Sequence, residues 1–250
     1  MARTAALGRL TWQVGEVIEA VPASARSRTL AFALPGWPGH RPGQHVDIRL
    51  TAEDGYQAAR SYSIASPPES DRVEITVEEL PDGEVSPYLV HDVIPGDLIE
   101  VRGPVGGYFV WDILLGGPLQ LIAGGSGIVP LMAMLRHRIA RESDIPVRLL
   151  YSSRSQDDAI YDAELRDITG SQPGVEITRT YTRMPPSGWD GYARRVDAAM
   201  LAEVVWPAAE GTHTFVCGPT GFVEAVAATL VQMGFDGTQI KTERFGPTGG

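Results

Sequence analysis

The chain has 250 residues, a single cysteine and a formal net charge of −10. One thiol excludes an intrachain disulfide, an all-cysteine zinc site and an iron–sulfur cluster held by this chain's own cysteines. The acidic balance argues against nucleic acid as a partner, because duplex-binding proteins usually present a basic surface. No apolar segment is long enough for a membrane span or a signal peptide, so we expect a cytoplasmic protein. We also expect a monomer.

Residues 5–112 are expected to form an antiparallel β-barrel. Apolar and polar residues alternate over Val73–Val77, the pattern of a strand with one buried face. Regularly spaced short strands, separated by turns rich in glycine and proline, are typical of a barrel or sandwich. The predicted strands are Thr11–Ala20, Ser27–Leu34, His45–Leu50, Ala59–Ile64, Arg72–Leu80 and Asp97–Arg102.

Residues 113–250 instead alternate strands with helices, which favours a doubly wound parallel α/β sheet. The predicted strands are Leu119–Ala123, Val147–Tyr151, Val175–Tyr181 and His213–Cys217. The predicted helices are Pro130–Arg141, Ile160–Ile168, Val196–Val205 and Gly221–Met233. The expected fold class is therefore β followed by α/β, with the boundary after residue 112.

A glycine loop joins the first strand of the second half to its helix, and it reads Gly124-Gly125-Ser126-Gly127, with Pro130 at the helix start. Glycines let the backbone approach a ligand closely, and a helix N-terminus presents free N–H groups to phosphate. The loop lacks the Lys-Ser/Thr pair of a P-loop and the usual dinucleotide spacing, so a simple tight turn is an equal alternative. Its place after the first strand of a parallel sheet favours ligand binding.

Three further segments carry possible chemistry. Cys217-Gly218-Pro219 ends a strand, where ligands of open α/β sheets bind, although a buried structural cysteine is the alternative. Arg60-Ser61-Tyr62-Ser63 closes a barrel strand and offers a phosphate clamp, a ring for stacking and a hydroxyl for a ring nitrogen. Gly83-Glu84-Val85-Ser86 leads into a short helix, which is another source of main-chain N–H groups for phosphate.

Five motifs, taken in chain order, resemble those of the ferredoxin–NADP reductase family. They are Arg60-x-Tyr62-Ser63, Gly83-x-x-Ser86, the Gly-Pro-x-Gly of residues 103–106, the glycine loop and Cys217-Gly218-Pro219. The likeness extends over residues 12–245. It implies a barrel that binds FAD and an α/β domain that binds NAD(P)H, in a stand-alone flavoprotein reductase without a fused iron–sulfur domain. Some relatives with the same Arg-x-Tyr-Ser use FMN; we expect FAD.

The resemblance also implies roles for individual residues. Arg60 and Gly83–Ser86 would bind the flavin pyrophosphate, Tyr62 would lie against the isoalloxazine, and Ser63 would hydrogen-bond its N5 atom. Gly124–Pro130 would hold the nicotinamide dinucleotide. The nicotinamide itself would be flanked by Cys217-Gly218-Pro219. Glu243 and Phe245 resemble the terminal acidic–aromatic segment of the family, but five residues follow Phe245 here. The expected catalytic residues are Ser63, Cys217 and Glu243.

NADPH is the expected donor, with NADH possible. The family meets the adenosine 2′-phosphate with polar and basic side chains after the second and third strands, where this chain has Arg154 and Arg183. An acidic residue on the ribose hydroxyl would favour NADH, and Asp157 and Asp158 are the candidates. The implied acceptor is a separate ferredoxin, flavodoxin or oxygenase component.

Two other functions are compatible with parts of the sequence. One is a flavin-free nicotinamide dehydrogenase, which would leave the arginine–tyrosine–serine segment unexplained. The other is a flavin-holding regulatory or electron-transfer subunit of a larger complex, against which the intact nucleotide half argues. The five histidines lack metal-ligand spacing, so no metal site is expected.

Overall fold

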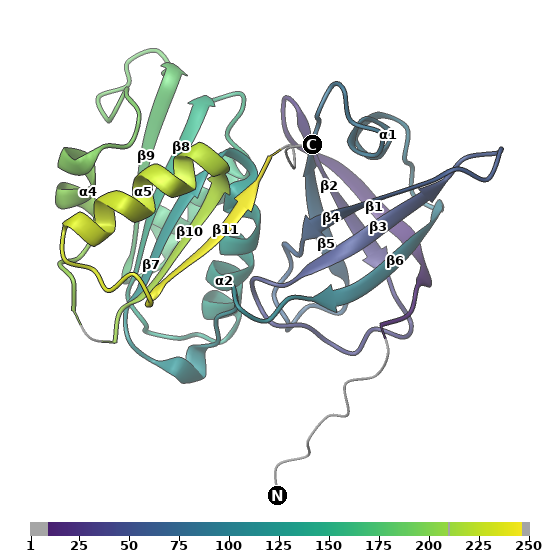
Figure 1. Cartoon of the computed structure of the whole chain (residues 1–250), viewed down its shortest axis with the longest axis horizontal. Coiled ribbons are helices and arrows are strands. Elements are labelled where there is room, and N and C mark those ends of the chain that lie inside the picture. Colours follow the sequence, from purple (N-terminus) through teal and green to yellow (C-terminus); the bar gives the residue numbers. More distant parts are fainter. Residues whose placement is uncertain (1–9, 210, 247–250) are drawn as a thin grey trace, which may run out of the picture.

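The computed structural model describes residues 10–209 and 211–246 and arranges them as two sheets that lie side by side (Figure 1). The first sheet has six antiparallel strands in the order β4-β3-β6-β1-β2-β5. Its edge strands approach each other at an isolated bridge between Ile64 and Ile75, which closes the sheet into a barrel. The strands are β1 (Gln13–Ser24), β2 (Ser27–Ala33), β3 (His45–Thr51), β4 (Gln57–Ser63), β5 (Val73–Glu78) and β6 (Leu98–Val105).

The barrel confirms the predicted antiparallel half. Its strands start and end within a few residues of their expected positions. The alternation of apolar and polar residues predicted them because successive side chains of a strand point to opposite faces. On β5, for example, Val73, Ile75 and Val77 are buried in the barrel core. Helix α1 (Ser86–His91) follows β5 and adds Leu89 to the same core.

The second sheet has five parallel strands in the order β11-β10-β7-β8-β9, which confirms the doubly wound half. Its strands are β7 (Leu119–Gly124), β8 (Val147–Ser155), β9 (Val175–Met184), β10 (His213–Pro219) and β11 (Ile240–Phe245), the last of which was not predicted. Its helices are α2 (Ile128–Ala140), α3 (Asp162–Ser171), α4 (Ala198–Val204) and α5 (Thr220–Gln232), with 3-10 turns η1 (Ile113–Leu115) and η2 (Gly125–Gly127). None of the helices described here is long and apolar enough to cross a membrane. No group of His, Cys, Asp and Glu among the described residues could hold a metal ion.

Helices cover both faces of the parallel sheet. Successive residues of a strand point to opposite faces, so Phe215 and Cys217 of β10 join the core beneath α2 and α3. Val216, between them, joins the core beneath α4 and α5. The first of these cores also contains Ala65 of the barrel half. The Cys217 side chain therefore lies on the face of the sheet that adjoins the barrel.

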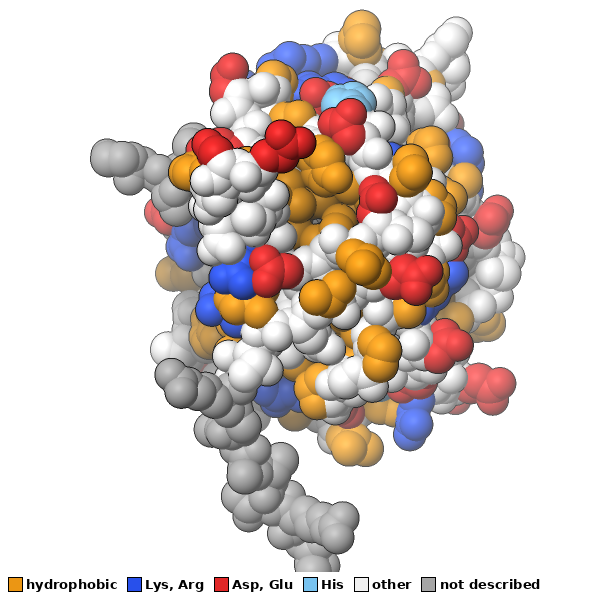
Figure 2. Space-filling view, turned by 90° about the vertical axis from the view of Figure 1, so that its right-hand side faces the viewer, with side chains coloured by type: hydrophobic (Ala, Val, Ile, Leu, Met, Phe, Trp, Pro, Cys, Tyr) orange, Lys and Arg blue, Asp and Glu red, His pale blue; other side chains and the backbone are white. Residues whose placement is uncertain are grey.

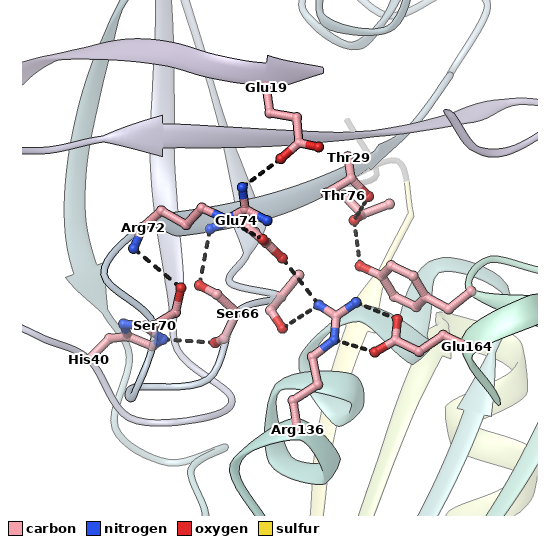
Figure 3. Close-up of polar contacts among 12 residues, drawn as sticks. Glu19, Thr29, His40, Ser66, Ser70, Arg72, Glu74, Thr76, Arg136 and Glu164 are labelled. Atoms are coloured by element: carbon pink, nitrogen blue, oxygen red, sulfur yellow. Dashed lines mark hydrogen bonds and ion pairs between the residues drawn. The ribbon is translucent and has the colours of Figure 1, made fainter. Parts of the chain in front are cut away.

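An arginine of α2 ties the two halves together (Figure 3). The Arg136 guanidinium donates to both carboxylate oxygens of Glu164 in α3, at 2.8 and 2.6 Å. Its Nη1 also donates to the main-chain oxygen of Ala65 at 2.9 Å and lies 3.4 Å from a carboxylate oxygen of Glu74, both in the barrel half. Because the arginine side chain is only 17% exposed, loss of a partner would leave a charge poorly solvated.

Two backbones come into direct contact where η2 follows β7. A Cβ built on Gly127 would lie 2.1 Å from the carbonyl oxygen of Cys217 and 2.7 Å from the amide nitrogen of Gly218. Those distances are far inside van der Waals contact, and the obstructing atoms are main-chain atoms that cannot rotate away. Glycine at position 127 therefore allows the loop to pack against the end of β10.

Replacing Gly127→Ala should lower the free energy of unfolding by about 1–3 kcal/mol, because overpacking forces the loop and β10 apart. Urea unfolding of the full chain measures this. Gly170→Ala is the matched control, because Gly170 lies in α3 with open space around its Cβ position. That control should be neutral or slightly stabilising, since alanine favours helix more than glycine does. Equal stability of Gly127→Ala and wild type would contradict the close approach.

Candidate functional site between the two halves

β10 and β11 end side by side at the carboxyl edge of the parallel sheet (Figure 1). In register, Cys217 lies opposite Glu243, and Pro219 lies opposite Phe245. The Cys217 thiol donates to Glu243 Oε2 at a distance of 3.8 Å. The fold therefore brings into contact two of the residues predicted to be catalytic. Phe245 packs, partly buried, against the same core as Cys217, and of the residues after it only Gly246 is described.

Burial controls the charge of this pair. It raises the pKa of Glu243 to about 7, although the hydrogen bond from Cys217 lowers it in part. Burial, followed by the neighbouring Glu243 carboxylate, raises the pKa of Cys217 well above its ordinary value. The thiol is therefore neutral, which argues against a thiolate nucleophile. His213 begins the strand that Cys217 nearly ends, about 13 Å away at 3.3 Å per residue, so the two do not form a Cys–His pair.

The glycine loop has the form of a nucleotide cradle. Gly125 has a φ of 54°, a conformation that favours glycine, and a Cβ there would have only Glu78 within 4 Å, at 3.9 Å. By contrast, a Cβ on Gly124 or Gly218 would lie about 3 Å from the Phe222 ring. The loop is thus closed on the side of Phe222 in α5 and open on the side of Gly125. Its other predicted members are the half-exposed Ser126 and the buried Gly127 and Pro130.

The loop also lies where the two halves meet. The turn η2 contacts β10 and β11 on one side and β5 of the barrel on the other. Ala65, two residues beyond Ser63 of β4, belongs to the same buried core as Cys217. The end of the barrel strand β4 and the end of β10 therefore face one interface, as a site for two cofactors requires.

The arginine–tyrosine–serine segment forms the end of β4. Tyr62 packs against the barrel core but keeps part of its surface exposed, and burial raises the pKa of its hydroxyl. Ser63 is 7% exposed, and its hydroxyl has no hydrogen-bond partner within the described part of the chain. The Ser61 hydroxyl, by contrast, donates a hydrogen bond to Asp47 Oδ1 at 2.6 Å. An unpaired hydroxyl beside a partly exposed aromatic ring fits a flat heteroaromatic ligand.

The Gly83–Ser86 turn precedes α1 and is held from within. The Ser86 hydroxyl accepts a hydrogen bond from the main-chain N–H of Leu80 at 3.0 Å, and Val85 is completely buried. A Cβ on Gly83 would lie 2.9 Å from that hydroxyl oxygen, so the turn closes around a glycine. The main chain of the turn is thereby fixed while the Glu84 side chain remains exposed.

An ion pair between the two predicted pyrophosphate-binding segments was not foreseen. Arg60 Nη2 lies 2.6 Å from Glu84 Oε2, and the Tyr56 hydroxyl donates to Glu84 Oε1 at 2.7 Å. Tyr56, Arg60 and Glu84 come from a loop, a strand and a turn that only the folded barrel brings together. In the sequence, the one signal that pointed to this ion pair was the position of Glu84 inside the Gly-x-x-Ser motif.

The two arginines predicted to bind the donor end neighbouring strands. β8 and β9 are parallel and paired nearly to their ends, so Arg154 and Arg183 lie at the same edge of the sheet. Both are exposed, and neither forms an ion pair with another described residue. Asp158, one of the two competing acidic candidates, accepts a hydrogen bond from the Ser155 hydroxyl at 2.6 Å.

Two family models match the chain in succession. Residues 15–110 match the oxidoreductase FAD-binding domain, and residues 121–228 match the oxidoreductase NAD-binding domain. The glycine betaine monooxygenase reductase subunit of Chromohalobacter salexigens is 35% identical over 211 residues, which are 83% of this chain and 56% of that protein. The chain spans about half to three-fifths of the length of the curated relatives it matches.

Solved structures share the whole arrangement. The FAD/NAD-binding domain of nitric oxide dioxygenase from Vibrio cholerae superposes with a TM-score of 0.83 at 27% identity, over 94% of this chain and 99% of that one. A ferredoxin NADP+ reductase from Neisseria gonorrhoeae, with bound FAD and NADP, superposes with a TM-score of 0.78. Its 20% identity, over 93% of this chain and 98% of that one, makes this a likeness of fold. With an FAD-binding barrel followed by an NAD-binding sheet, the chain belongs to the ferredoxin–NADP reductase-like family of oxidoreductases.

Proposed function

We propose that the chain takes electrons from NADPH and passes them through FAD to a separate one-electron carrier. The observation that carries the proposal is the position of η2, which contacts β5 of the FAD-binding half and β10 and β11 of the NAD-binding half. Two cofactors held there would lie against each other. The functional units are proposed as residues 5–112 and 113–250, of which 5–9, 210 and 247–250 lie outside the described residues.

FAD is proposed to bind along β4 and the turn before α1. Arg60 and the main chain of Gly83–Ser86 would bind its pyrophosphate, and Tyr62 would lie against its ring. The unpaired hydroxyl of Ser63 would hydrogen-bond the ring at N5. Bound FAD supplies the ability to accept a hydride and to release electrons singly, while the protein aligns and shields the reacting rings.

The nicotinamide donor is proposed to bind across the carboxyl edge of the parallel sheet. The open side of Gly124–Pro130 would hold its pyrophosphate, and Cys217-Gly218-Pro219 would flank its nicotinamide. Glu243, whose pKa is raised to about 7, would gain or lose a proton beside Cys217 near neutral pH. Phe245 would pack beside them at the end of β11.

The acceptor is proposed to be a ferredoxin, a flavodoxin or an oxygenase component. The chain has one cysteine, and its similarity to a monooxygenase reductase subunit supports an oxygenase component. Acidic and basic side chains are interspersed on the barrel side of the molecule (Figure 2). A carrier that docks there would meet mixed charge, which selects by local pairing and not by long-range attraction. A monomer is the proposed oligomeric state.

The purified chain should be yellow, and NADPH should bleach its visible flavin band. Ser63→Ala should keep its FAD but be reduced about fivefold to tenfold more slowly in stopped flow, because one hydrogen bond at the reacting ring is lost. Ser171→Ala, on the surface end of α3, is the control and should behave as wild type.

Reduction of Ser63→Ala at the wild-type rate would remove the role given to Ser63. A colourless chain that cannot be loaded with FAD would favour a flavin-free dehydrogenase. A yellow chain that neither NADPH nor NADH bleaches would favour a flavin-holding subunit.

Donor preference tests the arginine pair. Wild type should have a higher kcat/KM for NADPH than for NADH with a dye acceptor, and Arg154→Ala and Arg183→Ala should each cut that preference about tenfold, since a charge-assisted bond to phosphate is lost. The control is Arg166→Ala, which removes an exposed arginine already paired with Asp162 at 2.5 Å. A wild-type preference for NADH, or an unchanged preference in both variants, would refute the assignment.

The partly buried Glu243 carboxyl should make stability pH-dependent. Its pKa of about 7 exceeds the ordinary 4.5, so the folded chain binds the proton more tightly and loses stability as pH rises between those values. The loss attributable to this group is about 3 kcal/mol. Urea unfolding at pH 5 and pH 8 should show a smaller decline for Glu243→Gln than for wild type. The control is Glu224→Gln, which removes an exposed carboxylate paired with Arg244; its free energy of unfolding should fall with pH as that of wild type does. An equal fall in Glu243→Gln and wild type would contradict the raised pKa of Glu243.

A further inference from the structure

We propose that Glu84 competes with the flavin pyrophosphate for Arg60 and thereby weakens the hold of this chain on FAD. The inference rests on the proposed role of Arg60 and adds a residue that opposes it. In the structure, the Glu84 carboxylate binds the guanidinium that is proposed to bind a phosphoryl oxygen. FAD must displace that carboxylate when it binds.

The geometry of the pair carries the argument. Arg60 Nη2 lies 2.6 Å from Glu84 Oε2, while Arg60 Nη1 donates to the carbonyl oxygen of the adjacent Ala59 at 2.8 Å. Both ends of the guanidinium are thus engaged by the protein itself. A pyrophosphate that binds Arg60 through two parallel hydrogen bonds, as arginine binds phosphate best, uses Nη2 together with either Nη1 or Nε. Both arrangements include the nitrogen that Glu84 contacts.

Glu84 is held in this position from a third segment. The Tyr56 hydroxyl donates to Glu84 Oε1 at 2.7 Å, and the Tyr56 backbone is itself fixed by an N–H bond to Asp54 Oδ1 at 2.9 Å. The hydrogen bonds from Tyr56 and then Arg60 lower the pKa of Glu84, so the carboxylate is charged at neutral pH. Each oxygen of Glu84 therefore has its own donor.

The position of Glu84 adds repulsion to competition. It is the second residue of Gly83–Ser86, the turn whose main chain is proposed to hold the same pyrophosphate. A negative side chain on that turn would repel a pyrophosphate held there, because that group carries two negative charges. Both the Arg60 and Glu84 side chains are about half exposed, at 52% and 47%, so water and salt limit the effect to a modest one.

Dilution of the FAD-loaded full chain, followed by the rise in flavin fluorescence, measures the Kd for FAD. Glu84→Gln should bind FAD about fivefold more tightly than wild type, since an exposed ion pair no longer has to be broken. Tyr56→Phe, which frees one oxygen of Glu84 and leaves its charge, should tighten binding by a smaller factor. The matched control is Glu176→Gln on β9, which removes an equally charged partner at 2.9 Å from Arg148 of β8 and should leave the Kd unchanged.

Arg60→Ala distinguishes the proposed role of Arg60 in FAD binding from the proposed competition by Glu84. It should weaken FAD binding, and in its background Glu84→Gln should gain clearly less than in wild type. If Arg60→Ala binds FAD as wild type does, the proposed role of Arg60 fails, and the competition with it. If Arg60→Ala weakens binding but Glu84→Gln has wild-type or weaker affinity, the competition alone is refuted. An equal increase in FAD affinity from Glu84→Gln with and without Arg60 would also overturn the competition, because the effect of Glu84 would then not depend on Arg60.

Discussion

The relative placement of two separately folded sheets is the constraint on which the site depends. Arg136 meets it by binding Glu164 of its own half and both Ala65 and Glu74 of the barrel half. A second link joins the halves where the Tyr161 hydroxyl shares a hydrogen bond with Thr76. Since the arginine is largely buried, its charge requires all of these partners at once, which a sliding interface could not provide. A hydride can pass between two rings only if their spacing is held, and polar bonds of fixed geometry hold it better than apolar contact does.

Within that frame, the chemistry of each half follows from a different feature of its sheet. In the parallel half, neighbouring strands end together, so side chains distant in sequence become adjacent. The core beneath α2 removes water from Cys217, and Glu243 beside it is partly buried. In the barrel half, β4 ends with the partly exposed Tyr62, which packs against the barrel core, and with the buried Ser63, while Arg60 and Glu84 are exposed. The proposed site thus has a largely apolar floor around Cys217 and charged side chains at the exposed Arg60–Glu84 pair. That division suits rings that must meet closely and phosphates that must be held at a distance from them.

Local pattern was sufficient for most elements and insufficient for contacts between them. Alternation predicted β5, and an apolar run followed by glycines predicted β7 and its loop, because both patterns reflect burial of neighbours in sequence. β11 was missed because Ile240–Phe245 has charged or polar residues at four central positions and shows no apolar run. Arg136 and Glu84 were not assigned partners, since their partners lie 28 or more and 24 residues away. The motif order predicted a flavin-binding half followed by a nucleotide-binding half, which the family models confirm. The ion pair between Arg60 and Glu84 depends on the folded barrel alone.

The burial of Cys217 has a practical consequence for studying motion in this protein. It is the only thiol in the chain, it is completely buried, and its pKa lies well above the ordinary value. A thiol reagent reacts with the thiolate, so modification has to wait until the end of β10 separates from α2 and Glu243. The rate of modification then counts openings of the nucleotide-binding half. The wild-type chain carries its own single-site probe of that opening, with no competing cysteine to subtract.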